Sequence, residues 1–132
     1  MSVKQESENA VLIKIANGKE HKPHKRNIVS IDGQLIHYRF CTGSGRNRFP
    51  FNISPTTLTA KYEVWICGNA NCYYLIPIEV IGEIYKDEDT YKNKAHGQEN
   101  LRTMTVHTDT NVVKHGRNGK NKQIAQYLNK TI

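Results

Sequence analysis

Several features are scarce in this chain, and their scarcity narrows what it can be. No stretch of its 132 residues approaches the ~20 consecutive apolar residues that a transmembrane helix needs. The first nine residues are polar and include Glu6 and Glu8, so they resemble neither a secretory signal nor an Arg-rich transit peptide. The three cysteines are an odd number and too few for a secreted disulfide framework. We therefore expect a cytoplasmic protein with no membrane partner.

The common catalytic and metal-binding motifs are also missing from the sequence. It contains no Gly-x-Ser-x-Gly elbow, no P-loop and no dinucleotide-binding glycine pattern. The six histidines show no metal-ligand spacing. His21 and His24 lie three residues apart, but Pro23 between them argues against the helix that would bring them to one face. These motifs therefore identify neither a catalytic residue nor a metal ligand.

The cysteines leave two interpretations open. Cys67 and Cys72 flank the turn of a predicted hairpin, and two thiolates could begin a zinc site. A tetrahedral site would also need Cys41 and a histidine to converge on them. In the other interpretation all three cysteines are small apolar residues within a sheet.

An excess of positive charge is the clearest feature that is present. The chain has 19 Lys and Arg against 12 Asp and Glu, a net charge of +7 and a pI near 9.4. Residues 63–99 carry more acids than bases, whereas residues 14–48 are strongly basic and no acid follows Asp109. Basic flanks of this kind indicate a polyanionic partner, usually nucleic acid, and we favour DNA. The alternative is a charge that serves solubility alone.

The hydrophobic pattern predicts one α+β domain over residues 1–132, with a mainly antiparallel sheet of about five strands. Strands are expected at residues 11–15, 27–31, 34–41, 62–67, 72–77 and 102–107, the last of them an edge strand. Asp32-Gly33 suits the turn of the first hairpin. A short helix should follow Pro77 over residues 78–85, and a C-terminal helix should cover about 120–130. Residues 1–10 are expected to be a flexible N-terminus, 19–26 a loop, 86–101 a mobile loop and 108–132 a basic tail with its helix.

Candidate nucleic-acid contacts come from the basic strands, loops and tail. They are Lys22, Lys25, Arg26, Arg39, Arg46, Arg48, Lys114, Arg117, Lys120 and Lys122. The glycine-rich loop at residues 42–48 could present backbone N–H groups and two arginines to a phosphate, or could be a solvated hairpin connection. Base reading would need groups such as Arg117, Asn118, Asn121 and Gln123 at the start of the last helix, which could instead be a solvated terminal helix.

The apolar strand at residues 62–67, the aromatic strand at 72–77 and the sequence Ile76-Pro77 before a helix resemble a passage in small PD-(D/E)XK nuclease-fold proteins. The preceding basic strand and loop, Tyr38-Arg39-Phe40 and then residues 46–48, also look like the region before that passage. The resemblance covers about half the chain and implies Mg²⁺-assisted phosphodiester hydrolysis. It would place Lys14 at the family's lysine position, on a strand at residues 11–15. Leu12 stands where that family has an acid, so Asp32, Glu63 or Glu79 would have to substitute.

Three functions follow as hypotheses. The first is a nucleic-acid-binding protein, with DNA favoured, that contacts the phosphate backbone through its basic loops. The second is a metal-dependent DNA endonuclease, for which Mg²⁺ would be the cofactor. The third is a basic protein-interaction subunit or inhibitor that meets an acidic protein. A homodimer on a two-fold duplex is compatible with each DNA-binding reading.

Overall fold

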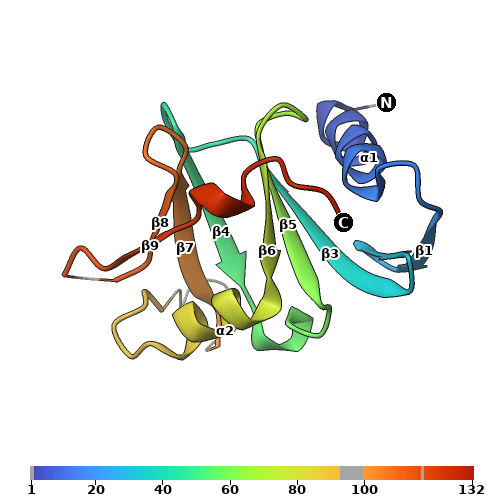
Figure 1. Ribbon diagram of the computed structural model, residues 1–132. Coiled ribbons are helices and arrows are strands. Elements are labelled where there is room, and N and C mark those ends of the chain that lie inside the picture. The colour runs from blue at the N-terminus through green and yellow to red at the C-terminus, as the bar shows by residue number, and fades with distance from the viewer. Residues whose placement is uncertain (1, 93–99, 117) are drawn as a thin grey trace.

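The computed structural model describes residues 2–92, 100–116 and 118–132, which form an α+β fold of two helices and two mostly antiparallel sheets (Figure 1). The predicted fold class is confirmed, although the strands divide between a five-stranded and a four-stranded sheet. Helix α1 packs on one face of the larger sheet, and the smaller sheet packs on the other. The larger sheet is thus the middle layer, which explains why its central strands are apolar on nearly every position.

Helix α1 (Val3–Ala16) occupies the residues for which we predicted a flexible segment and then a strand at 11–15. Its start is a capping box, in which the Gln5 N–H donates to Ser2 Oγ at 3.1 Å and the Ser2 N–H donates to Gln5 Oε1 at 3.2 Å. The predicted strand is wrong, because the buried positions follow a helical period. The hydrophobic residues buried along the helix are Val11, Leu12, Ile15 and Ala16.

The larger sheet has the order β1-β2-β3-β5-β6. Its strands are β1 (His21–Lys25), β2 (Ile28–Ile31), β3 (Gln34–Cys41), β5 (Tyr62–Cys67) and β6 (Tyr73–Pro77). Both predicted hairpins are confirmed, and positive φ angles at Asp32 and Gly33 form the first turn. The predicted loop at residues 19–26 is wrong in part, because β1 pairs with β2 as an edge strand. An edge tolerates Pro23, which has no N–H to donate.

The smaller sheet has the order β4-β7-β8-β9. Its strands are β4 (Arg48–Ile53), β7 (Arg102–His107), β8 (Val112–Lys114) and β9 (Asn121–Gln123). The predicted strand β7 is confirmed, but it is not an edge strand, because β4 pairs with it on one side and β8 on the other. Strand β9 extends this sheet where we expected the last helix to begin.

The segments that follow these strands close the fold. Helix α2 (Ile78–Lys86) follows Pro77 as predicted, and Ile81 and Ile84 enter the core between the sheets. The predicted C-terminal helix is wrong, because β9 and the 3₁₀ turn Ala125–Tyr127 stand in its place. The chain then runs beside β6, where the Asn129 N–H donates to the Tyr73 carbonyl at 2.8 Å. This contact holds the end of the chain in an extended form.

Two further expectations concern the loop at 86–101 and the membrane. Residues 93–99 of the predicted mobile loop lie outside the described residues. Before them the backbone of Tyr91 is bonded to β7 and to the residue that follows β8: its N–H donates to the His115 carbonyl at 2.8 Å, and its carbonyl accepts from the Thr103 N–H at 3.0 Å. None of the helices in the described part of the chain is long and apolar enough to span a membrane.

Candidate nucleic-acid interface

The outer face of the four-stranded sheet is polar and basic. Alternate residues of β4, β7 and β8, such as Phe51, Met104 and Val113, point into the core, so the residues between them point outward. The outward residues on the four strands are Arg48, Pro50, Asn52, Thr103, Thr105, His107, Val112, Lys114, Asn121 and Gln123. None of them is a carboxylate. We call this surface the basic sheet face.

Arg48, His107 and Lys114 form the centre of the basic sheet face. Arg48 is paired with His107 across β4 and β7, and Lys114 is paired with Thr105 across β7 and β8. Together with Tyr91 these four residues line a shallow hollow of about 400 Å³. The Arg48 and Lys114 side chains make no ion pair with any described residue. Two cations therefore stand on strands with their charges uncompensated.

The pKa of His107 reflects the positive charge around it at the centre of the basic sheet face. Partial burial lowers the pKa of His107, and the nearby Lys114 and Arg48 charges lower it further. Asp109, in the turn that follows β7, acts in the opposite direction. The imidazole is therefore uncharged at neutral pH in the isolated protein, and a bound anion would favour its protonated form.

The glycine-rich loop at residues 42–48 leads directly into the basic sheet face. Two of its backbone donors are used within the loop: the Ser44 N–H donates to the Arg48 carbonyl at 3.0 Å, and the Arg48 N–H to the Gly45 carbonyl at 3.4 Å. Gly43 has φ +103°, and a Cβ there would lie 3.1 Å from the Phe49 ring. These contacts close the loop into a turn. Its two arginine side chains, at residues 46 and 48, are exposed and can contact a phosphate.

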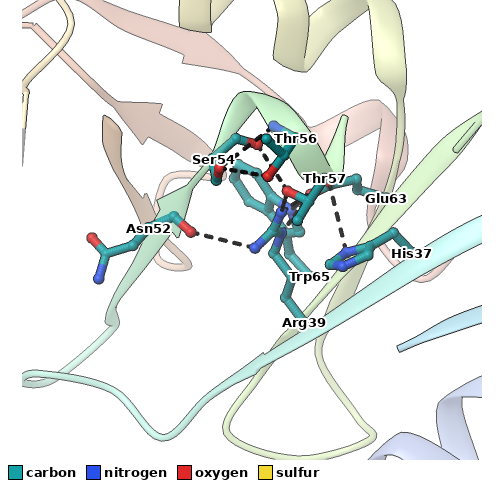
Figure 2. A network of polar contacts seen from close by, with 8 residues as sticks. All are labelled: His37, Arg39, Asn52, Ser54, Thr56, Thr57, Glu63 and Trp65. Carbon is teal, nitrogen blue, oxygen red and sulfur yellow. Dashed lines mark hydrogen bonds and ion pairs between the residues drawn. The ribbon is translucent and has the colours of Figure 1, made fainter. Parts of the chain in front are cut away.

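Arg39 does not belong to this surface, although the sequence made it a candidate. Figure 2 shows its guanidinium directed at Glu63 and Thr57, between β3 and the turn after β4. Arg39 Nε and Nη2 donate to the Glu63 carboxylate at 2.8 and 3.2 Å, and Nη2 also donates to Thr57 Oγ1 at 2.5 Å. Trp65 Nε1 donates to the same carboxylate at 2.8 Å. These bonds hold Arg39 in a structural network.

His37 lies beside this network on β3. Its Nδ1 is 3.8 Å from Glu63 Oε2 and has no hydrogen-bond partner among the described residues (Figure 2). Burial lowers the pKa of His37, the Arg39 charge adds to this effect, and Glu63 opposes it. The ring is therefore neutral near pH 7 and enclosed, which does not suit a group that must reach a polynucleotide.

The other sequence candidates are dispersed. Lys22 and Lys25 lie on β1, and Arg26 follows them, at the opposite side of the fold from β8 and β9 (Figure 1). Lys120 is bound by Asp87 and Asp89 at 3.0 and 2.9 Å, and Lys122 by Glu83 at 3.1 Å. Arg117 lies outside the described residues. The fold therefore brings only some of the predicted basic residues together: Arg48 and Lys114 share the basic sheet face, and Lys22, Lys25 and Arg26 lie apart from them.

The acids considered for a nuclease site do not converge. Glu63 is buried against Arg39, Glu79 is exposed on α2, and Asp32 lies in a turn 3.6 Å from Lys19. Lys14 is on a helix, where its Nζ donates to the Ala70 carbonyl at 2.8 Å. Within residues 2–92, 100–116 and 118–132, no three His, Cys, Asp or Glu side chains are arranged to hold a metal ion.

Sequence reasoning missed His107, Thr105 and Tyr91 as parts of the surface. The sequence pattern predicts the strand β7, but we predicted no strand at the residues of β4. The pairing of Arg48 with His107 across these two strands was therefore not expected. The run Arg48-Phe-Pro-Phe-Asn-Ile53 does alternate polar and apolar positions around Pro50, and this was the available signal.

No family model matches the chain, and neither a curated protein nor a solved structure is significantly similar to it. The resemblance to PD-(D/E)XK proteins therefore depends on short sequence patterns alone: the β5–β6 hairpin with the helix after Pro77, and the basic strand and loop that precede them.

Proposed function

We propose that this protein binds nucleic acid, DNA in the first instance, through the basic sheet face. The observation that carries the proposal is the pair of exposed, unpaired cations, Arg48 and Lys114, on either side of His107. No outward residue of the four strands is an acid that would repel phosphate. Strands hold these groups at fixed positions, so ordering them on binding costs less entropy than ordering a loop would.

Each group on the face has a distinct role in this proposal. Arg48 can grip one phosphate through two parallel N–H bonds, whereas Lys114 acts as a point charge. Thr105 supplies a hydroxyl between them, and the exposed Tyr91 ring borders the same hollow, where a base could stack. Arg46, in the preceding loop, extends the charge. Such contacts supply affinity and salt dependence, and they carry no sequence information.

The two alternative functions have less support. A metal-dependent endonuclease needs converging acids, and Asp32, Glu63 and Glu79 lie apart. A protein-interaction role would use the same positive charge, and it becomes the preferred reading if polynucleotides fail to bind.

The test removes two charges from the basic sheet face. Arg48→Ala/Lys114→Ala should weaken binding of a fluorescent DNA duplex by an order of magnitude or more at low salt. Fluorescence anisotropy across a salt series should show the slope of log K against log[salt] falling by about 2, because each lost phosphate contact removes roughly 0.9. Single-stranded DNA and RNA of the same length, measured alongside, would identify the preferred polymer.

The matched control is Lys22→Ala/Lys25→Ala, which removes the same net charge from β1 on the other side of the fold. It should change the affinity by less than the first variant and leave most of the slope. If the β1 variant loses as much binding, the location of the site is wrong. If the native chain binds none of the polymers, the proposal itself is wrong.

A further inference from the structure

Two cysteines face each other at the end of the β5–β6 hairpin. The ladder pairs Ile66 with Tyr73, which places Cys67 directly opposite Cys72, and the Cys67 N–H donates to the Cys72 carbonyl at 2.9 Å. Residues directly opposite each other on antiparallel strands have Cα atoms about 4.5–5.5 Å apart. That separation lies inside the range of roughly 4.4–6.8 Å that a disulfide spans. Both side chains lie on the same face of the sheet.

The surroundings of the two thiols differ. Cys67 is buried in the core between the sheets, whereas Cys72 is only half-buried, at the end of the turn at residues 68–71. The parallel ladder of β3 and β5 places Cys41 beside Cys67 on its other side. Cys41 accepts a hydrogen bond from the Gly43 N–H at 3.4 Å. Cys41, like Cys72, is half-buried, so the buried Cys67 lies between two partly accessible thiols.

The same arrangement sets the reactivity of each thiol. A hydrogen bond with the Cys67 thiol lowers the pKa of Cys72 to about 7; burial opposes this shift, and a hydrogen bond with the Tyr74 hydroxyl assists it. The hydrogen bond with Cys72 is the main cause that raises the pKa of Cys67, and burial raises it further. Because the thiolate is the nucleophile in disulfide exchange, Cys72 is the group that reacts first.

We propose that Cys72 and Cys67 form a redox-active dithiol whose substrate is a small-molecule disulfide such as oxidised glutathione. The Cys72 thiolate attacks one sulfur of the disulfide, so that a mixed disulfide forms and one thiolate leaves. Cys67 then attacks Cys72 Sγ, closes the Cys67–Cys72 bond and releases the second thiol, while its own proton passes to the leaving sulfur. Two protein thiols are oxidised, and one disulfide is reduced to two thiols. Excess dithiothreitol reverses the reaction.

The experiment uses the reduced full chain, oxidised glutathione at neutral pH, rapid alkylation of remaining thiols and mass spectrometry. The native chain should lose two hydrogens and keep one alkylatable thiol. No Lys or Arg lies between Tyr62 and Lys86, so trypsin leaves Cys67 and Cys72 on one peptide and separates Cys41. The new bond should therefore lie within a single peptide.

Three variants assign the roles. Cys67→Ser should accumulate a stable mixed disulfide on Cys72, because nothing resolves it. Cys72→Ser should react at least ten times more slowly, and Cys41→Ser should behave like the native chain. The proposal is overturned if a Cys41–Cys67 bond forms instead, or if glutathione stays attached to the native chain. It is also overturned if the native chain reacts no faster than the Cys72→Ser variant.

Discussion

Glu63 is a carboxylate that the fold removes completely from water. Its side chain is 0% exposed, and three N–H donors from Arg39 and Trp65 surround its oxygens. Burying a charge is costly unless it is paired and hydrogen-bonded, and here both conditions are met. Three segments of the chain, β3, β5 and the turn after β4, are therefore joined through one side chain and its partners (Figure 2).

Glu63→Gln should reveal this role. The substitution keeps the shape of the side chain but leaves the Arg39 charge without its counterion, at a cost of about 3 kcal/mol in the free energy of unfolding. Urea unfolding followed by circular dichroism measures it. The control is Glu83→Gln, whose carboxylate is largely exposed and pairs with Lys122 at 3.1 Å; it should cost less than about 1 kcal/mol. Equal costs for the two variants would argue against a structural role for the network.

At the scale of elements, helix α1 is the segment for which the sequence-based prediction was wrong. In a helix Val11 and Ile15 share one face and Ile13 points away from it, whereas in a strand all three would share a face. In the structure Val11 and Ile15 are 0% exposed and Ile13 is 63% exposed. The burial of these three residues therefore distinguishes the helix from the strand.

Two alanine variants test the helix. Ile15→Ala should lower the free energy of unfolding by about 2–5 kcal/mol, because it leaves a cavity against the larger sheet. Ile13→Ala should change it by less than about 0.5 kcal/mol, since the side chain is exposed. Comparable losses in the two variants would favour the strand. Both are measured by urea denaturation under the same conditions.

The elements that were predicted correctly are those bordered by residues typical of turns or helix starts. Asp32-Gly33 and the residues between Cys67 and Cys72 fixed both hairpins of the larger sheet, and Pro77 fixed the start of α2. The five apolar or long side chains at residues 11–15 fit either period, and the capping box of Ser2 and Gln5 was the signal that would have decided for a helix. The apolar residues near the C-terminus fit a helix by spacing, but the chain there pairs with β6 instead.

The candidate site was predicted less completely, because it depends on contacts between distant residues. Arg48 and Lys114 were recognised as basic, but only the pairing of β4 with β7 and of β7 with β8 places them around His107. Arg39 was predicted as a contact because it is basic. Its partner Glu63 lies 24 residues away in the sequence, and no local pattern shows that the two side chains meet. Sequence thus indicated which residues are charged, and the fold determined which charges are left unpaired.

For the whole molecule, the arrangement of charge matters more than its total. Many of the exposed cations are separated by the width of the fold, with Lys22 and Lys25 on β1 and Arg48 and Lys114 on the opposite sheet (Figure 1). Asp87, Asp89 and Glu83 neutralise the tail lysines at 120 and 122. A polyanion that binds at the basic sheet face therefore meets a local field, and its strength depends on the protonation of His107.

Binding of DNA should consequently strengthen as the pH falls. In the isolated protein, burial and the Lys114 and Arg48 charges lower the pKa of His107, so the ring is neutral at about pH 8. A phosphate beside it favours the imidazolium and raises that pKa in the complex, so binding takes up a proton at pH values between the pKa of the free protein and that of the complex. Duplex affinity should be several-fold higher near pH 5.5 than near pH 8 at fixed salt, and His107→Gln should remove most of this change. His24→Gln, on β1, removes a histidine from the far side of the fold and should leave the pH dependence in place. If the two variants flatten it equally, the anion does not bind beside His107.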